Sequence, residues 1–573
     1  MLTVVGDLAQ TPTKTEDRRA NPALRWRPYV PRIVAYVMRL TSVLTVLGIL
    51  LPESRQHFSS AAADAMGDGL AFATASVAAG LQFVLAGAVR RRRRRAWWLA
   101  VIVVSIGICA HIKAGSRWVL LLNALLLVLL LWSRRDFTAR SEPGTRWNAV
   151  RAFVLMAAVS LTAGMFLTRH TAPRSPWSDR FTETFFGLLG FAPNLKFREP
   201  QLSALTEVAL TTMGAATALV TFLVVLAPAR KRAHLDPDTA KRLRALLQRF
   251  GDRDSLGYFA LRDDKTAIFS PSGKAAIAYR VVAGVSLASG DPLGDPEAWP
   301  PAIEEWIAEA DSYAWVPGVI GCSEEAARAY VRAGFDALEI GDEAVIDLAD
   351  FSFSGRSMRV VRQAVRRVER AGYKATVHRQ CELGKAEIEE AVAAADRFRD
   401  GETERGFSMA LSRLGDPSDP DVVLVRARDE QGRLVGLLCF VPWGCDGLSL
   451  DLMRRSRDSE NGTVEFMVAA LVDKAGELGV RRVSLNFAVF RSAFDRGGRV
   501  GAGPVMRVWR QVLLLASRWW QIESLYRANA KYNPEWVPRF VCFRRATELP
   551  RVTLGALEAE AFLMRPRLFR RYG

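Results

Sequence analysis

The first 230 residues alternate long apolar runs with short polar connections, whereas the rest of the chain does not. Six runs are long and apolar enough to cross a bilayer as helices. The fourth run is short, so the number of spans is six with an uncertainty of one. The runs cover about 33–51, 68–89, 97–113, 117–132, 149–168 and 204–227. The pattern predicts an α-helical transmembrane domain over residues 32–230, preceded by a basic segment over 1–31.

Arginine-rich connections predict the orientation of these spans. The three main ones are Arg90–Arg95, Arg134–Arg146 and Arg230–Arg232. If six spans alternate, all three lie on the side of the N-terminus, which the positive-inside rule makes cytoplasmic. We therefore expect a multi-pass plasma-membrane protein with its N-terminus and its C-terminal half in the cytoplasm. On the opposite side, the semi-apolar stretch Phe181–Phe191 is expected to lie in the membrane interface.

From residue 235 onward the chain shows short strands and amphipathic helices in two successive rounds. Leu256–Phe259, Ala337–Ile340 and Glu343–Asp347 are among the strands expected in the first round. Each round has meandering strands followed by a helix–strand unit, which predicts two similar domains over 235–350 and 351–573. This α/β (α+β) order resembles the acyltransferase fold of the GNAT superfamily, twice in tandem. The glycine-rich stretch Arg496–Gly503 lacks that superfamily's pyrophosphate-loop spacing, which argues against a coenzyme A donor.

Charge and cysteine content narrow the function classes. The net charge of +18 predicts attraction to polyanions, either anionic lipid headgroups or nucleic acid phosphates, and does not choose between them. Six cysteines without a CxxC pair and only five histidines offer no zinc-type ligand cluster, so no metal site is expected.

The stretch Ser449–Arg455 is the strongest candidate for chemistry. It alternates like a half-buried strand and presents Asp451, Arg454 and Arg455 at its end. Strand ends are where rigid sheets offer polar groups to ligands. On the pattern alone, a salt bridge at the strand end explains these residues equally well.

A second basic feature is the predicted helix around residues 357–371. Its arginines suit a tRNA-binding or membrane-facing surface, and an ordinary solvated helix face explains them about as well. The three arginines that we assign to this tRNA or lipid surface are Arg359, Arg362 and Arg366.

Five stretches in order along the chain together resemble one known family. They are Gly290–Asp295, Glu404–Met409, Leu450–Arg455, Ser484–Ala488 and Leu525–Arg539. They are similar to the cytoplasmic domain of the MprF family of lysylphosphatidylglycerol synthases, and most of all to the N-terminal portion of the actinobacterial LysX proteins. The resemblance covers the whole soluble half and, more loosely, the six-span half.

The resemblance implies transfer of an aminoacyl group, most simply lysine, from aminoacyl-tRNA to the glycerol hydroxyl of phosphatidylglycerol. The product would lower the negative charge of the membrane and give resistance to cationic peptides. Because an aminoacyl ester is already activated, no metal, flavin or nucleotide cofactor is expected. LysX proteins continue into a lysyl-tRNA synthetase, whereas this sequence stops at Gly573, so we expect a separate synthetase to supply the charged tRNA.

The resemblance also implies roles for particular residues. Asp451 would hold the α-ammonium group or assist proton transfer, and Arg454 and Lys531 would contact phosphates or developing charge. A capping carboxylate and a buried strand amide are adequate alternative explanations for two of the weaker substrate-binding candidates, Glu465 and Asn486. The full set of substrate-binding candidates is Glu404, Phe407, Ser408, Arg455, Glu465, Asn486 and Asn529.

Two other functions stay open at this point. One keeps the fold and changes the donor to alanyl-tRNA, because the carboxylate that would recognise a lysine side chain cannot be chosen among Glu402, Glu404 and Asp446. The other is a non-catalytic membrane regulator that binds tRNA or lipid, for which Asp451→Ala would leave the biological effect intact. The pattern also leaves a homo-oligomer and lipid flipping by the spans open.

Overall fold

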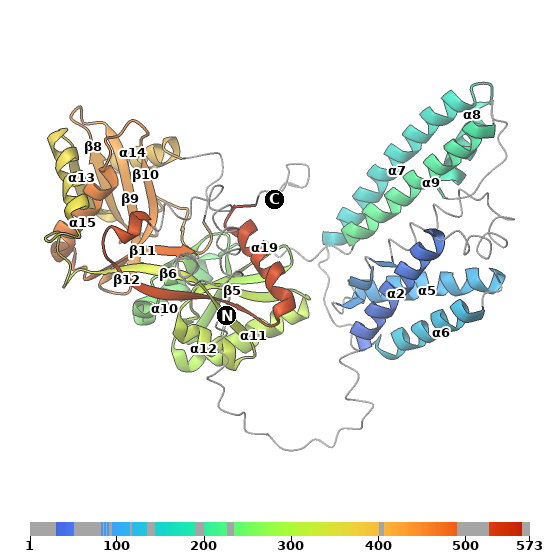
Figure 1. Cartoon of the computed structure of the whole chain (residues 1–573), viewed down its shortest axis with the longest axis horizontal. Helices are drawn as coiled ribbons and strands as arrows, with labels where there is room; N and C mark the ends of the chain where they lie inside the picture. Colours follow the sequence, from blue (N-terminus) through green and yellow to red (C-terminus); the bar gives the residue numbers. More distant parts are fainter. Residues whose placement is uncertain are drawn as a thin grey trace, which may run out of the picture. The chain divides into compact units, whose positions relative to one another are not determined.

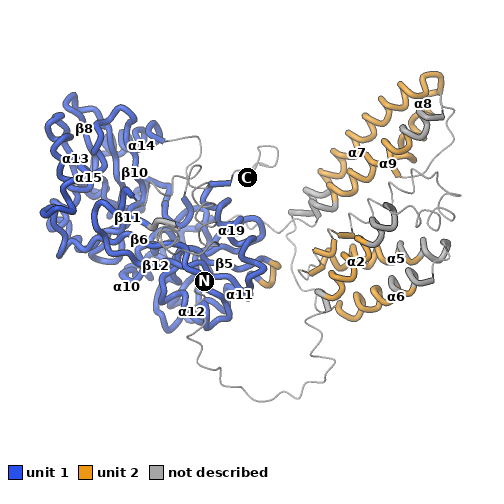
Figure 2. The backbone as a smooth tube through the Cα atoms, in the orientation of Figure 1, with its two compact units in different colours: residues 1–12, 230–310, 315–573 blue, residues 13–229, 311–314 orange. Residues whose placement is uncertain are grey.

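A computed structural model describes residues 30–50, 82–90 (except 84 and 88), 94–114, 117–134, 144–189, 200–225, 234–399, 406–489 and 527–563. The chain forms two compact units, made mainly of residues 13–229 and of residues 230–310 with 315–573 (Figure 2). Glu402 and Glu404 lie outside the described residues, as does the glycine-rich stretch 496–503.

The smaller unit is helical (Figure 1). Val150–Thr171, within α7, is the one helix among the described residues that is both long and apolar enough to cross a membrane. Ile33–Val43 and Ala96–Ser105 are shorter apolar helical stretches, so the count of six spans stays a prediction. The helices that the structure describes here are Val30–Leu50 (α2), Arg94–Ala114 (α5), Arg117–Trp132 (α6), Gly144–Thr171 (α7), Trp177–Leu188 (α8) and Pro200–Val225 (α9).

The larger unit is built on one mixed sheet of twelve strands, whose path runs β1-β2-β3-β5-β12-β6-β11-β10-β9-β8-β7, with β4 paired to β2. The strands are Thr266–Phe269 (β1), Ala275–Val282 (β2), Val285–Ser289 (β3), Leu293–Gly294 (β4), Val316–Cys322 (β5), Asp336–Asp347 (β6), Lys374–Arg379 (β7), Val423–Arg428 (β8), Leu434–Trp443 (β9), Gly447–Arg455 (β10), Arg482–Val489 (β11) and Glu535–Phe543 (β12).

The two ends of this sheet repeat one pattern. In each, antiparallel strands lead to a parallel pair, which is β3 with β5 at one end and β10 with β11 at the other. A helix joins the members of each pair: Trp299–Ser312 (α11) and Thr463–Leu478 (α15). The strands that follow are exchanged, because β12 pairs with β5 and β6 pairs with β11. The sheet is therefore continuous across residue 350, and the two-domain boundary at that position stays a prediction.

Two strand predictions need correction. Leu256–Phe259 does not form a strand, because Gly257–Leu261 forms the 3-10 helix η4, whose apolar side chains are buried. The strands predicted at Ala337–Ile340 and Glu343–Asp347 are one strand, β6, which runs through Gly341 and Asp342 without a break. Tertiary packing outweighs local propensity at both places.

Alternation along the central strands explains how both faces of the sheet are covered. Val423 and Val425 of β8 enter a core cluster with Val361 and Leu471, whereas the intervening Leu424 enters a separate cluster on the other face. The first cluster is closed by α13 and α15, and the second by α10 and α14. The remaining α-helices in the described part of this unit are Pro237–Phe250 (α10), Glu324–Arg332 (α12), Arg359–Arg370 (α13), Lys385–Arg397 (α14) and Leu549–Ala559 (α19).

Candidate functional site

The candidate site lies where the parallel strands β10 and β11 separate. Their paired register ends at Ser449 and Ser484. Beyond that point β10 has an irregularity between Leu450 and Leu452, and β11 has one after Ser484. Such irregularities re-aim side chains and end strand pairing. They expose the edges of two neighbouring strands at the position of Asp451.

Asp451 is half-buried and already oriented. Its Oδ1 accepts a hydrogen bond of 2.6 Å from the backbone N–H of Leu411, and the Cys439 Sγ lies 3.6 Å from its Oδ2. Burial, and next the charge of Asp451, raise the pKa of the Cys439 thiol well above its usual value, so the thiol stays protonated. The carboxylate of Asp451 therefore has a fixed direction at the strand opening.

Arg454 lies on the same strand, half-buried, and its Nε is a buried donor with no hydrogen-bond partner in the described part of the chain. A buried donor without a partner costs about 1–3 kcal/mol. The neighbouring Arg455 instead donates to the Ser459 Oγ at 3.2 Å and to the Ser456 carbonyl at 3.5 Å. Of the two arginines, Arg454 is the one whose guanidinium is available to an anionic ligand.

Two asparagines hold the strand opening. Asn486 has a positive φ of 69°, and its Nδ2 donates to the Leu450 carbonyl beside Asp451. Its Oδ1 is buried and has no partner among the residues described. The Asn529 Nδ2 donates to the Leu485 carbonyl at 3.3 Å. Both amides thus brace the backbone, and Asn486 keeps one acceptor for a ligand.

Lys531 and Glu465 form a pair. The Lys531 Nζ lies 2.7 Å from the Glu465 Oε1, in the first turn of α15. The capping interpretation of Glu465 is incomplete, because its carboxylate binds this lysine from the segment that follows β11 in the described chain. Lys531 therefore reaches the site only if this ion pair is exchanged for a ligand phosphate.

The loop of residues 406–414 lines Asp451 and is held by buried charges. The Glu560 carboxylate accepts the backbone N–H groups of Phe407 (2.7 Å) and Ser408 (3.0 Å) and also the Ser408 hydroxyl. Arg262 donates to the Ala410 carbonyl at 2.6 Å. Phe407 and Ser408 are fully buried, so the structure assigns them to holding this loop rather than to an open surface.

Lys265 supports the same loop from the other side. Its side chain is fully buried, and its Nζ donates to the Phe259 carbonyl at 3.0 Å and to the Ser289 Oγ at 2.6 Å. The Nζ also lies 4.4 Å from the centre of the Phe407 ring. Burial, and next the charge of Arg262, lower the pKa of Lys265 to about 7.

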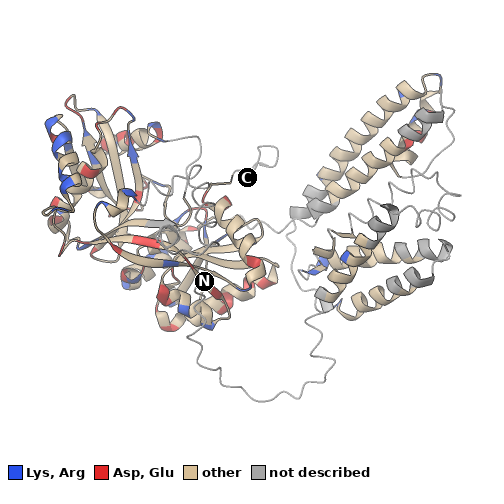
Figure 3. Cartoon of the chain, in the orientation of Figure 1, with Lys and Arg blue, Asp and Glu red and all other residues tan. Residues whose placement is uncertain are grey.

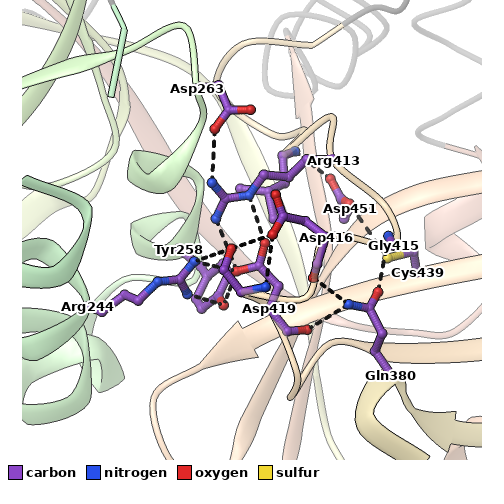
Figure 4. A network of polar contacts seen from close by, with 12 residues as sticks. Arg244, Tyr258, Asp263, Gln380, Arg413, Gly415, Asp416, Asp419, Cys439 and Asp451 are labelled. Carbon is purple, nitrogen blue, oxygen red and sulfur yellow. Dashed lines mark hydrogen bonds and ion pairs between the residues drawn. The ribbon is translucent and has the colours of Figure 1, made fainter. Parts of the chain in front are cut away.

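The far end of the loop is anchored on Asp419, which is 1% exposed (Figure 4). Arg413 binds both of its oxygens, at 2.7 and 3.1 Å, and Arg244 and the Tyr258 hydroxyl bind its Oδ1 at 2.9 and 2.7 Å. Gln380 ties down the Asp416 carbonyl at 2.7 Å. Figure 4 shows Asp451 beside this network, so groups distant in sequence fix the loop that orients it.

Arg539 forms the most buried ion network of the larger unit. Its guanidinium binds Glu343 (Nε at 2.9 Å), Asp254 (2.7 Å) and the Ser255 hydroxyl (2.8 Å). Glu343 also accepts the Ser484 hydroxyl, at the last paired residue of β11. Arg539 thus stabilises the place where the sheet opens.

Asp291 in the Gly290–Asp295 motif lies beside this network. It holds Ser323, the N-cap of α12, by accepting the Ser323 N–H at 2.7 Å and the Ser323 hydroxyl at 2.6 Å. Burial, and next the charge of Asp254, raise its pKa to about 7, against the opposing effect of Arg539. The motif is therefore part of the structural frame.

The basic helix α13 carries the arginines assigned to a tRNA or lipid surface (Figure 3). Arg359 and Arg366 are exposed, and within the described ranges neither forms an ion pair. Arg362 is turned back, since its Nη1 donates to the carbonyls of Phe353 and Gly355, the latter at 2.7 Å. The surface is thus carried by Arg359 and Arg366 and not by Arg362.

Three potential metal-ligand groups, those of Asp252, Cys445 and Asp446, lie within 4.8 Å of one another. Arg482 already neutralises the two carboxylates, at 3.5 Å from Asp252 and 3.3 Å from Asp446. This guanidinium already supplies the positive charge beside both carboxylates, so an ion pair accounts for the cluster. Asp446 is thereby committed to Arg482.

Sequence reasoning missed the groups that hold the site, namely Lys265, Arg262, Arg413, Asp419 and Glu560. The most distant hydrogen-bond partners of Arg262, Arg413, Asp419 and Glu560 lie 150 to 175 residues away, and no local spacing reveals such pairs. Arg539 lay within a recognised motif but had no assigned role. The local sequence contains no signal for Lys265, because it follows three charged residues, Arg262, Asp263 and Asp264, as an exposed turn would.

Comparisons with known proteins agree with this arrangement. Residues 244–543 match the family model of the phosphatidylglycerol lysyltransferase C-terminal region, and residues 26–226 match that of the transmembrane region of lysyl-tRNA synthetase. The structure of L-PGS from Bacillus licheniformis superposes with a TM-score of 0.50 at 21% identity, covering 59% of this chain and all of that chain. The larger unit therefore has an L-PGS-like fold, and the N-terminal part is a membrane region.

The first of these models matches more than half of the chain, so the chain belongs to the phosphatidylglycerol lysyltransferase family. The lysylphosphatidylglycerol biosynthesis bifunctional protein LysX of Rhodococcus jostii is 46% identical over 450 residues, which are 78% of this chain and 40% of that protein. The LysX of Mycobacterium marinum is 45% identical over 443 residues, covering 77% and 40%. The chain thus spans about two fifths of the length of these relatives.

Proposed function

We propose that this protein transfers an aminoacyl group, lysine in the first place, from aminoacyl-tRNA to the glycerol hydroxyl of phosphatidylglycerol at the cytoplasmic membrane face. The observation that carries the proposal is the strand opening, where an oriented carboxylate (Asp451) shares one strand with a guanidinium donor that lacks a partner (Arg454). Family membership and the membrane region support the lipid acceptor.

The proposed reaction needs alignment more than activation. An aminoacyl ester is exchanged for another ester, so the protein must bring two anionic substrates together, move a proton and stabilise an oxyanion. Asp451 would accept the α-ammonium group or the proton of the attacking hydroxyl. Arg454 would bind a phosphate, which a guanidinium fork suits. The free Oδ1 of Asn486 offers one further acceptor for an ammonium group.

Further parts of the proposal concern Lys531, Arg455 and Glu404. Lys531 would exchange Glu465 for a phosphate of the tRNA end or of the lipid. Arg455 and the exposed α13 arginines, Arg359 and Arg366, would contact the tRNA body or anionic headgroups. Glu402 and Glu404 are the remaining candidates for recognising a lysine side chain, because Asp446 is committed to Arg482.

The membrane topology in the proposal follows the basic connections. Six spans, with the N-terminus and the larger unit in the cytoplasm, would bring the site next to the inner leaflet that contains phosphatidylglycerol. The resulting lysyl lipid would carry net positive charge and weaken the binding of cationic peptides once it reaches the outer surface. A separate synthetase as donor supplier and a homo-oligomer remain predictions.

The test uses the full chain in phosphatidylglycerol liposomes with tRNA charged with labelled lysine or, separately, labelled alanine. We expect label in the lipid fraction with lysine and its loss in Asp451→Asn. Asp458→Asn, an exposed carboxylate on the loop after β10, is the matched control and should retain transfer.

Transfer of alanine but not of lysine would show that the donor is alanyl-tRNA, and the proposed mechanism would still apply. If a folded protein transfers neither amino acid, the enzyme proposal is wrong, and the tRNA- or lipid-binding regulator becomes the better explanation. Filter binding of charged tRNA by the same preparation would then measure that regulator's expected activity.

A further inference from the structure

The short helix α8 packs lengthwise against α7 and α9. A Cβ at Gly164 of α7 would lie 2.5 Å from the Thr184 Cγ2, and one at Gly187 would lie 2.7 Å from the Leu210 Cδ1 of α9. The Thr168 and Thr184 hydroxyls are 3.3 Å apart. Small residues and hydroxyl pairs at helix contacts are typical of packing inside membranes. Since α7 ends at Thr171 and α8 begins at Trp177, these contacts make α8 antiparallel to α7.

The same contacts fix how far α8 descends along α7. The Ser160 Oγ lies 2.8 Å from the Thr217 Oγ1 and 3.5 Å from the Met213 carbonyl, so this part of α9 is level with Ser160. The next residue, Gly214, touches the backbone of Leu188 at the end of α8. The apolar part of α7 is bounded by Arg151 and Arg169, and Ser160 lies midway between them, about 13 Å from each. The end of α8 is therefore level with the middle of the apolar stretch.

The beginning of α8 is level with a belt of charged residues. Antiparallel alignment through Gly164 and Thr184 brings Asp179 and Arg180 to the height of Arg169. The guanidinium of Arg180 donates to the Pro173 carbonyl at 2.9 Å, in the turn before α8. Trp177, which is exposed, lies at the same end, where membrane proteins place aromatic residues of the headgroup region. Figure 3 shows the coloured charges near this end of the α7–α9 pair.

Beyond the belt, the exposed side of α8 is apolar. We call its exposed residues Phe181, Phe185, Phe186 and Leu189 the aromatic stripe. The rings of Phe181 and Phe185 stack at 6.1 Å, and the exposed Thr182 hydroxyl donates to the Ser178 carbonyl of its own helix at 2.9 Å. The one charged residue beyond the belt, Glu183, is buried against the neighbouring helices. The stripe thus offers solvent no charged group and no unbonded hydroxyl.

We propose that α8 is inserted into one leaflet, from the headgroup level at Asp179 to the bilayer middle at Leu188, with the aromatic stripe against lipid acyl chains. A helix that lies in the interface plane keeps a polar face along its whole length. In α8 the exposed charges are confined to the first turn, and the stripe is level with exposed apolar residues of the span itself, such as Val159 and Phe166. The occupant of the stripe is therefore the same as that of the α7 surface, which is lipid.

The test measures depth along α8 in the full chain. A ketone-bearing phenylalanine analogue is placed singly at Phe181, Phe185 or Leu189, labelled with a nitroxide, and reconstituted into phosphatidylglycerol–phosphatidylethanolamine liposomes. Collision rates with oxygen and with a water-soluble nickel chelate report depth. We expect depth to increase by about 6 Å per four residues from Phe181 to Leu189. Labels at Phe166 and Val159 of α7 are the matched controls, because they lie near the heights of Phe181 and Leu189.

Three results would overturn the proposal. Equal depth at all three positions would mean that α8 lies in the interface plane, and strong nickel collisions would mean that it lies in water. Low collision rates with both reagents at all three positions would mean that protein, such as a second copy, covers the stripe in place of lipid. None of these outcomes depends on the transferase activity, so the two proposals fail separately.

Discussion

Arginines of the larger unit occur in two opposite settings. The side chains of Arg539 and Arg413 are only 3% and 9% exposed, and both bind carboxylates. Arg454, Arg359 and Arg366 have no carboxylate partner in the described chain. A buried guanidinium is tolerated only when its partners neutralise it. Substitution of a paired, buried arginine should therefore lower the stability of the fold. Substitution of an arginine without a carboxylate partner should instead weaken substrate binding or transfer.

The largest effect is expected for Arg539→Met. The change leaves Glu343 and Asp254 buried without their cation, which costs about 3–5 kcal/mol and should prevent stable folding. Thermal unfolding in detergent micelles, monitored by circular dichroism, measures it. Arg545→Met is the control, because Arg545 is half exposed and pairs with Glu548 only at 3.8 Å. Equal unfolding temperatures for the two variants would contradict the structural role.

Asp451→Asn is expected to act on transfer and not on stability. Asparagine keeps an oxygen for the Leu411 N–H but cannot take up a proton or balance an ammonium charge. The rate of lipid lysylation should fall about 10²–10⁴-fold, the usual range for a lost acid–base group. An unchanged rate would show that Asp451 takes no part in the reaction. A large fall in unfolding temperature would show that its role is structural.

Arg454→Gln tests the arginine that lies beside Asp451 without a carboxylate partner. Loss of a charge-assisted contact costs about 1.5–3 kcal/mol, so kcat/KM should fall about 10–100-fold while the unfolding temperature stays constant or rises. A rise is expected if the unpaired Nε is a net cost to the free protein. Arg433→Gln is the control, because Arg433 is exposed and pairs with Asp429 away from the strand opening. Similar kcat/KM values for both variants would contradict a role for Arg454.

The lowered pKa of Lys265 predicts that the stability of the fold depends on pH. Its pKa is about 7 in the fold and about 10.4 in an unfolded chain, so the unfolded state binds more protons between these values. Stability should therefore rise with pH through this window by about 1.4 kcal/mol per unit from this group. The unfolding temperature of the native protein should gain on that of Lys265→Met between pH 7 and about pH 9. A difference that does not change with pH would show that the pKa of Lys265 is not lowered and that the side chain stays charged in the fold.

The smallest effect is expected on α13. Arg359→Glu with Arg366→Glu should raise the KM for charged tRNA several-fold and reduce its dependence on salt, because phosphate contacts release counterions. Stability should not change, since both side chains are exposed. Arg328→Glu on α12 is the control surface change. An equal KM shift in the control would indicate a general charge effect in place of a binding surface.

Much of the fold could be predicted because it depends on local patterns. The alternation at Ser449–Arg455 correctly indicated the strand β10, whose observed start at Gly447 lies two residues earlier. The prediction failed at η4, where buried aromatic and aliphatic side chains suggested a strand. Periodicity cannot tell whether a short buried apolar segment is a strand or a helix, because tertiary packing decides its backbone conformation.

The candidate site could be predicted only in its centre. Asp451 and Arg454 were visible as polar residues at the end of a strand, but Arg362 belonged to the same helical pattern as Arg359 and turned out to bind backbone carbonyls. Glu465 and Lys531 were separate candidates that the structure joins as one ion pair. Such pairings depend on side-chain direction, which spacing along the chain does not report.

By itself, the sequence determined where the apolar runs, the strand with Asp451 and the family motifs lie, because these are properties of neighbouring residues. The tertiary structure alone decided which charges neutralise one another, how β6 and β12 are exchanged across the sheet, and which arginine remains without a partner beside Asp451. The physical reason is that burial and electrostatic pairing depend on distances in space between residues that are far apart in the chain. A carboxylate such as Glu560 can orient the loop beside Asp451 only once the fold has brought them together.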